Sequence, residues 1–257
     1  MVVSMRFFLT HCCLAFVLIT YTLGIFSCLG HDYDTPIIET DTLIIRKLLD
    51  TNNLIETHVN DAVILNFKGE VISIELMNSN LDSVVLPDNV FELNSLEIIK
   101  LFGNNLISLP DNLKNITQLR ELYIGENDFS NFPDVILEMT FLEKLSFPNN
   151  HTKLSIPSNI SNLKNLKYLG LNWNKIDSLP NSIGELDSLQ MIYVNNNNLS
   201  NLPVNITKLD LLVGDYEGCS CPANNFGVNK LCEMSNDLIV WLDKYDEDWR
   251  ESQKCIQ

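Results

Sequence analysis

The chain has 257 residues and an apolar content of 46%, which is enough for a sizeable hydrophobic core. Its formal net charge of −16 at pH 7 argues against nucleic acid as a partner, because phosphate binding needs clustered Lys and Arg. The same acidity would attract a basic partner at long range.

Residues 1–30 have the pattern of a secretory signal peptide. After a single arginine, a mainly apolar run extends from Phe7 to Leu29, and Cys28 and Gly30 are small enough for a cleavage site. The run is long for a signal core, so an uncleaved N-terminal anchor is an alternative, and a bacterial lipoprotein box is a fainter one. We therefore expect a secreted or extracellular protein, attached to a membrane only if this leader is retained.

Residues 31–70 are expected to form an N-terminal cap. Apolar residues recur at helical spacing from Asp41 to about Leu49, and Asp and Thr at the start can cap this helix. The apolar runs 62–66 and 71–76 flank a four-residue turn and predict a hairpin. The helix would cover the exposed end of the core that follows.

Residues 71–212 carry the dominant pattern, a block of the form LxxLxLxxNxLxxLPxxIxxLxx. Its leading leucines follow one another at 23 or 24 residues, and the strand around Ile74 matches the same pattern, so we expect six repeats. Alternate residues of each short strand would enter a core and the others would face out. The leading leucines are Leu96, Leu119, Leu142, Leu166, Leu189 and Leu212.

Two positions inside the block have their own physical role. The ninth residue is an asparagine whose carboxamide can turn inward and bond backbone groups that the strand leaves unpaired. The proline ends the strand because it has no N–H to donate. The asparagines are Asn104, Asn127, Asn150, Asn174 and Asn197, and the prolines are Pro110, Pro133, Pro157, Pro180 and Pro203.

Two blocks depart from the pattern. The first has Ser79 in place of the asparagine and about two extra residues before Leu86. The block from Leu142 to Leu166 has one extra residue near His151. We interpret it as a tolerated loop insertion or as a rim feature that helps to set the shape of a ligand site.

The repeats resemble the leucine-rich repeat family in its 23-residue LP type, over roughly residues 71–212. The resemblance implies an α/β repeat solenoid, a right-handed superhelix with a parallel sheet on its concave face and the LPxxIxxL halves on its convex side. The family mostly supplies binding surfaces, so the resemblance implies a non-catalytic module and leaves the partner open.

After Leu212 the period ends, and residues 213–257 are expected to form a C-terminal cap. Its four cysteines predict disulfides, and a zinc site is less favoured because the segment has no histidine. A CxC followed by two later cysteines is similar to the C-terminal cap of extracellular leucine-rich repeat proteins, which implies the pairs Cys219–Cys232 and Cys221–Cys255. Ser235 can cap a helix, and Trp241 and Trp249 are expected in the core of the cap.

The sequence contains no catalytic constellation. It has no glycine-rich phosphate loop, HExxH, GxSxG or kinase motif set, so we expect no enzyme, no cofactor and no metal. The outward strand positions of the concave face are the default site, because aromatic and Met side chains are enriched where proteins bind proteins. The candidate protein-binding residues are Lys100, Phe102, Tyr123, Tyr168, Trp173, Met191 and Tyr193.

Three functions follow from this pattern. The first is a secreted module that binds an extracellular or cell-surface protein through the concave face. The second is a structural or self-associating cell-surface protein. The third, a cytoplasmic signalling scaffold, conflicts with the leader and the cysteines, because intracellular thiols stay reduced.

Five NxS/T motifs are also present, either as glycosylation sites or as products of an Asn-rich composition. Asn150 belongs to the inward asparagines and should stay unmodified. The candidate glycosylation sites are Asn115, Asn159, Asn198 and Asn205.

Overall fold

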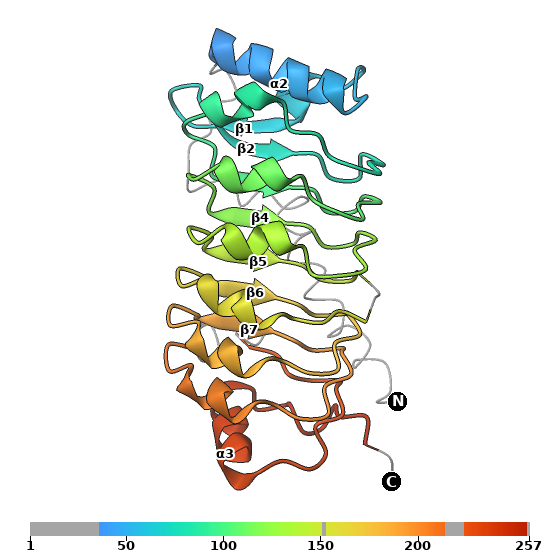
Figure 1. Ribbon diagram of the computed structural model, residues 1–257, viewed down its shortest axis with the longest axis vertical. Coiled ribbons are helices and arrows are strands. Elements are labelled where there is room, and N and C mark those ends of the chain that lie inside the picture. Colours follow the sequence, from blue (N-terminus) through green and yellow to red (C-terminus); the bar gives the residue numbers. More distant parts are fainter. Residues whose placement is uncertain (1–35, 151–152, 214–223, 256–257) are drawn as a thin grey trace, which may run out of the picture.

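The computed structural model describes residues 36–150, 153–213 and 224–255, which build a stack of similar layers with a helix at each end (Figure 1). The described residues form a seven-stranded sheet in the order β1 to β7. The predicted leader, Cys219, Cys221 and His151 lie outside the described residues. The strands are β1 (Val63–Leu65), β2 (Val71–Glu75), β3 (Ile98–Lys100), β4 (Glu121–Tyr123), β5 (Lys144–Ser146), β6 (Tyr168–Gly170) and β7 (Met191–Tyr193).

Each layer is one coil of the chain, consisting of a strand, a turn and a short 3-10 helix. Coils 1 to 6 begin with β2 to β7, and these strands pair in parallel without a change of register. The register brings the central aliphatic residue of every strand into one buried column, as the repeat pattern predicts. The column consists of Ile74, Ile99, Leu122, Leu145, Leu169 and Ile192.

A 3-10 helix returns the chain on the other side of each coil, and it begins directly after the proline of the LP pair. The proline φ angles lie between −66° and −75°, close to the value that the ring imposes. One apolar residue in the middle of each helix is buried. The helices are η3 (Asp88–Glu92), η4 (Asp111–Asn115), η5 (Asp134–Glu138), η6 (Ser158–Asn162), η7 (Asn181–Glu185) and η8 (Val204–Lys208).

The inward asparagines join neighbouring coils by hydrogen bonds. In coil 5, Asn174 Nδ2 donates to the Phe147 carbonyl of coil 4 at 2.9 Å, and Asn174 Oδ1 accepts from the Asn150 N–H at 2.9 Å. The asparagines of coils 2, 3 and 6 make the same pair of contacts with the coil before them. Since these carboxamides are buried, they satisfy backbone groups that water cannot reach.

Asn150 departs from this pattern. Its Nδ2 donates to the Phe147 and Pro148 carbonyls of its own coil, and its Oδ1 has no hydrogen-bond partner among the described residues. Coil 4 is the one with the 24-residue spacing. The extra residue therefore coincides with a weaker side-chain link between coils 3 and 4.

The N-terminal end of the core is covered by α2 (Glu39–Thr51), which buries Ile44, Ile45, Leu48 and Leu49. The predicted start of this helix was wrong, because it begins at Glu39 and no side chain caps it. The Asp41 carboxylate instead accepts the N–H of Val71 at 3.0 Å and so joins the helix to β2. β1 and β2 form the predicted antiparallel hairpin, preceded by the short helix η2 (Val59–Asp61).

The 23-residue period ends after Leu212 as predicted, but the stack of coils continues, so the prediction of six repeats was one too few. Residues 224–231 form a seventh coil in which Phe226, Asn229 and Leu231 take the places of Val194, Asn197 and Leu199. Asn225 bridges to Tyr193 in parallel, and the Asn225 carbonyl accepts the Val194 N–H at 2.9 Å. Asn229 bonds coil 6 in the same way as the earlier asparagines bond the coil before them. The Leu199 N–H donates to Asn229 Oδ1 at 3.1 Å.

The C-terminal tail closes the edge of this last coil. Val228 N–H donates to Ser252 Oγ, Leu231 N–H donates to Gln253 Oε1, and Lys254 N–H donates to the Asn229 carbonyl.

This path brings Cys255 to Cys232, and the two are bonded to each other. Both cysteine pairs implied by the family resemblance are therefore wrong. The helix α3 (Asn236–Tyr245) follows Ser235, whose side chain makes no capping bond, and Trp241 and Trp249 are buried as predicted.

We expect Asn174→Ala to lower the free energy of unfolding by about 3 kcal/mol, because it leaves buried backbone groups in coils 4 and 5 without partners. Asn181→Ala, at an exposed position on η7, should change it by less than about 0.5 kcal/mol. Urea unfolding followed by circular dichroism measures both. Equal losses would contradict a structural role specific to the inward carboxamides.

Candidate binding face

The strand register places the outward side chains in two columns on the sheet, which with Phe102, Trp173 and Asn195 we call the concave face. All seven candidate binding residues belong to it. The first column is Ser73, Ile98, Glu121, Lys144, Tyr168 and Met191, and the second is Glu75, Lys100, Tyr123, Ser146, Gly170 and Tyr193.

An aromatic cluster occupies the middle of this face. Lys144 Nζ lies 5.1 Å from the ring centroid of Tyr123 and 5.2 Å from that of Tyr168, so the cation joins two rings from coils 3 and 5. The ring of Tyr168 lies 5.4 Å from that of Tyr193 in coil 6. Four coils thus contribute to one continuous surface, as the strand positions predict.

Small residues between the tyrosines make this packing possible. A Cβ at Gly170 would lie 3.1 Å from Cε1 and 3.2 Å from the hydroxyl of Tyr168. The neighbouring position in coil 4 is Ser146. The ring of Tyr168 can therefore lie close to the backbone instead of standing away from the sheet.

The charged side chains on the concave face, and those of the residues just before its strands, are paired between coils. Lys100 Nζ lies 2.7 Å from Glu75 Oε1, Lys144 Nζ lies 3.9 Å from Glu121 Oε2, and Lys167 Nζ lies 2.6 Å from Glu143 Oε2. Each lysine follows its partner by 23 to 25 residues, which is about one turn of the solenoid. Because these opposite charges neutralise each other, the aromatic and amide groups are the ones that remain for contact with a ligand.

Tyr123 is held as a neutral phenol. Its hydroxyl donates to Glu121 Oε2 at 2.6 Å. Partial burial raises the pKa of Tyr123 above that of an ordinary phenol, and the Glu121 carboxylate raises it further by its charge and by accepting the hydrogen bond. Tyr123 therefore acts on this face as a hydrogen-bonding aromatic group and not as an anion.

The residue before each inward asparagine, and before Ser79 in the first coil, has a positive φ. These residues include Asn78, Gly103, Glu126, Asn149, Trp173, Asn196 and Val228. Gly and Asn adopt this left-handed conformation easily, whereas other side chains are strained there. Trp173, with φ of 58°, is thus a strained residue and is also 39% exposed.

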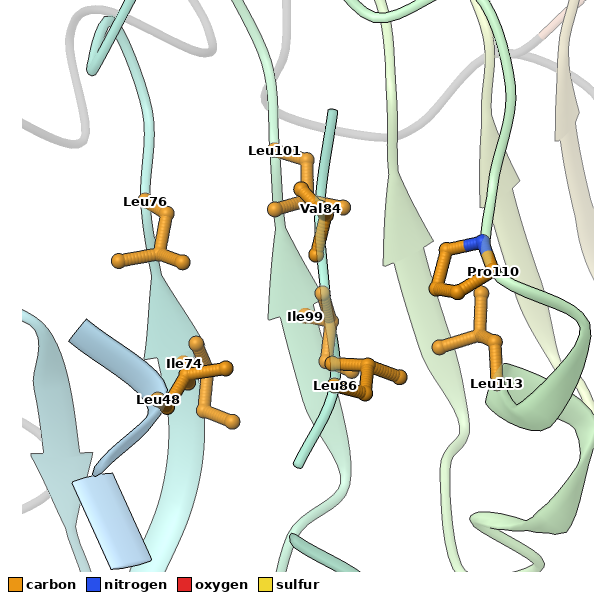
Figure 2. Close-up of a pocket in the computed structure, with 9 residues that line it drawn as sticks. All are labelled: Leu48, Ile74, Leu76, Val84, Leu86, Ile99, Leu101, Pro110 and Leu113. Carbon is orange, nitrogen blue, oxygen red and sulfur yellow. The ribbon is translucent and has the colours of Figure 1, made fainter. Parts of the chain in front are cut away.

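One cavity in the described structure is not a ligand site. It measures about 10 Å³ and lies between α2 and the first coils, where Leu48, Ile74, Val84 and their neighbours point into it (Figure 2). The residues that line it are aliphatic apart from Pro110, so it offers a ligand or a water no hydrogen bond. It is a packing defect beside the first repeat, which carries the extra residues.

The described residues contain no group of three or more His, Cys, Asp or Glu side chains that could hold a metal ion. Of the helices described, none combines the length and the apolar character needed to cross a bilayer.

Sequence reasoning did not single out Lys144 or Asn195. Lys144 stands out only because the rings of Tyr123 and Tyr168 lie beside it, and their nearness follows from the strand register between coils. Asn195 is buried, and its Oδ1 has no hydrogen-bond partner in the described chain. The signal that could have found both is their outward strand position within the repeat.

Comparison with known proteins agrees with this geometry. The family model of the leucine-rich repeat region matches residues 149–234, which includes the seventh coil. The chain is a leucine-rich repeat protein. Comparison with curated proteins gives no match.

Several solved leucine-rich repeat structures are similar to this chain. The PEPR1–AtPEP1 structure is 25% identical, with a TM-score of 0.52, and the match covers 68% of this chain and 27% of that one. The ectodomain of the plant receptor kinase GASSHO1/SCHENGEN3 from Arabidopsis thaliana, in complex with CASPARIAN STRIP INTEGRITY FACTOR 2, is 30% identical with a TM-score of 0.47 and coverages of 62% and 19%. The plant peptide hormone receptor RGFR1 in complex with RGF2 is 25% identical, with a TM-score of 0.49, and the match covers 65% of this chain and 29% of that one. This leucine-rich repeat chain spans less than a third of each of them.

We expect Glu121→Gln to lower the pKa of Tyr123, because it removes the charge that opposes the phenolate. In the unfolded chain a tyrosine ionises near pH about 10, before the folded Tyr123 does. The contribution of Tyr123 to the free energy of unfolding is therefore fully present below that pH and is lost as the pH rises above it. Tyr123→Phe should make the free energy of unfolding fall less over this range.

Absorbance titration of the folded protein measures the first effect, and urea unfolding at about pH 8 and about pH 10.5 measures the second. Glu138→Gln, at an exposed residue on η5, is the matched control. Identical phenol titrations of the two Gln variants would show that Glu121 does not act on Tyr123.

Proposed function

We propose that this protein is an extracellular, non-catalytic module that binds a protein or peptide through its concave face. The observation that carries the proposal is the continuous Tyr123–Lys144–Tyr168–Tyr193 cluster, built by four adjacent coils. Aromatic side chains on a rigid sheet give a partner a large contact area at little entropic cost. The similarity in fold to the PEPR1–AtPEP1 structure is in keeping with this function.

The rest of the concave face favours selection by shape and hydrogen bonding. Its lysines are paired with glutamates, so a partner need not supply an opposite charge. Lys100 of coil 2 lies 6.0 Å from the ring centroid of Tyr123, and Met191 pairs with Tyr168 between β7 and β6. Phe102 and Trp173 follow β3 and β6 on the same face. We therefore expect an affinity that depends only weakly on salt, unlike that of a charge-steered complex.

Export and glycosylation form part of the same proposal. The 1–30 leader would direct secretion, and Asn115 and Asn159 are exposed on η4 and η6, away from the concave face. Asn198 and Asn205 are half-buried, and Asn150 is 1% exposed, so sugar on Asn150 would require local unfolding. Mass spectrometry of the exported protein tests this: sugar on Asn150, or none on the other four in a glycosylating host, would contradict it.

The binding face is tested by crosslinking followed by affinity measurement. With p-benzoylphenylalanine at position 168, the full exported chain should capture its partner from conditioned medium, whereas the same group at position 114 on η4 should not. Tyr123→Ala, Tyr168→Ala and Tyr193→Ala should each weaken binding of the purified partner at least about tenfold, because each removes a central aromatic contact.

Phe67→Ala is the matched aromatic control, since Phe67 is 83% exposed at the hairpin and lies off the concave face. Unfolding free energies of all four variants separate lost contacts from lost fold. Unchanged affinity in the three tyrosine variants would end the assignment of this face. A partner that proves to be only a second copy of the chain, seen by light scattering, would favour self-association instead.

A further inference from the structure

A buried polar atom on the concave face has no hydrogen-bond partner among the described residues. Asn195 follows β7 in coil 6 and is 6% exposed, and its Oδ1 accepts no hydrogen bond from the described residues. Buried carboxamide oxygens in folded proteins are nearly always bonded, and those of coils 2, 3, 5 and 6 at the inward positions are. Asn195 Oδ1 is therefore a buried acceptor that lacks a partner within the described residues.

Asn195 lies directly beside the strained residue of the concave face. The N–H of Trp173 in coil 5 donates to the Asn195 carbonyl at 3.0 Å. Trp173 has the left-handed backbone conformation that Asn or Gly adopts at most of the equivalent positions. Glu126 and Val228 share this conformation, and what distinguishes Trp173 is a large apolar side chain that is 39% exposed on the same face as the tyrosines.

The described residues next to Asn195 in coils 6 and 7 are uncharged. Tyr193 precedes Asn195 by two residues and packs on Tyr168, and the corresponding position in coil 7 is Gly227. On this part of the face the groups offered to a ligand are aromatic rings, amides and bare backbone. Tyr, Trp, Asn, Ser and Gly are the residues that antibody combining sites use to bind polypeptides.

We propose that Asn195 and Trp173 form a subsite for an extended peptide segment, an inference that rests on the proposed function. Asn195 Oδ1 accepts a backbone N–H of the ligand, and Trp173 packs against the ligand side chain next to it. The amide turns its oxygen toward the ligand by rotation about χ2, a soft torsion in asparagine. A backbone donor suits this site because a buried neutral acceptor can bond an uncharged N–H without the cost of burying a charge.

The test uses peptides selected on the immobilised full exported chain from a phage-displayed random library. A selected peptide is synthesised with each backbone amide N-methylated in turn, which removes one donor at a time. We expect one N-methyl peptide to bind at least tenfold more weakly. Asn195→Leu should weaken the parent peptide by a similar factor, and the two changes together should cause no further loss. Asn181→Leu, at an exposed convex position, should leave all affinities unchanged.

Trp173 is tested by a change that separates stability from binding. Trp173→Gly relieves the left-handed conformation, so it should raise the melting temperature while weakening peptide binding at least tenfold. Val228→Gly relieves the same conformation in coil 7 and should raise the melting temperature with unchanged affinity. A Trp173→Gly chain that binds as tightly as the native chain would overturn the role of Trp173.

The two proposals fail in different ways. Peptides whose binding depends on Tyr123, Tyr168 and Tyr193, but not on Asn195 or Trp173, would overturn the subsite and leave the proposed function standing. Selected peptides that bind the three tyrosine variants as well as the native chain would contradict both. A parallel glycan array that binds through Asn195 and Trp173, when no peptide does, would replace the peptide with a sugar as the ligand of the subsite.

Discussion

The structure depends on one constraint: no coil of this chain can by itself bury its apolar side chains and bond its inward backbone groups. Each coil has an aliphatic edge that must be covered and backbone groups, turned inward after the strand, that must be bonded. Leucines and isoleucines in register meet the first need, and the inward asparagines meet the second by bonding a carbonyl and an N–H of the preceding coil. The two mechanisms act at the same spacing, which is why a repeat of 23 residues can be continued indefinitely.

The same requirement explains where the structure departs from regularity. At one end α2 covers the core with four aliphatic side chains and joins β2 through Asp41. At the other end the tail around Ser252 and Gln253 bonds the last coil, and the Cys232–Cys255 disulfide holds it there. In the interior, Asn150 of the longer coil 4 is bonded within its own coil, so it links coils 3 and 4 less firmly than the other inward asparagines link theirs.

Because the inward residues of the repeat supply the packing and hydrogen bonds of the core, the fold places few demands on the residues at the outward positions. Their side chains contribute little to the core, and selection can use them for contact with a partner. The tyrosine cluster, the paired charges, the strained Trp173 and the unbonded Asn195 all occur at such positions. The last two are unfavourable for the folded protein alone, which is the pattern expected where function and stability compete.

The periodic features of this fold were predictable from sequence because each is repeated. The aliphatic column, the inward asparagines and the proline that precedes each 3-10 helix were read from spacing alone. The seventh coil was not, because Asn224 and Phe226 replace aliphatic residues and the coil lies 32 residues after coil 6 instead of 23. The start of α2 was mispredicted because Asp41, a good capping residue, is used to bond Val71. Lys144 and Asn195 depend on neighbours in other coils, which local sequence does not specify.

The most direct measurement is amide hydrogen exchange at Leu106, Ile176 and Leu199, whose N–H groups donate to the carboxamides of Asn127, Asn197 and Asn229. Water has little access to these bonds, so the three amides should exchange far more slowly than exposed turn amides, Leu199 included although its partner lies in the seventh coil. Exchange as fast as that of exposed turn amides would contradict the central claim that asparagine carboxamides hold neighbouring coils together.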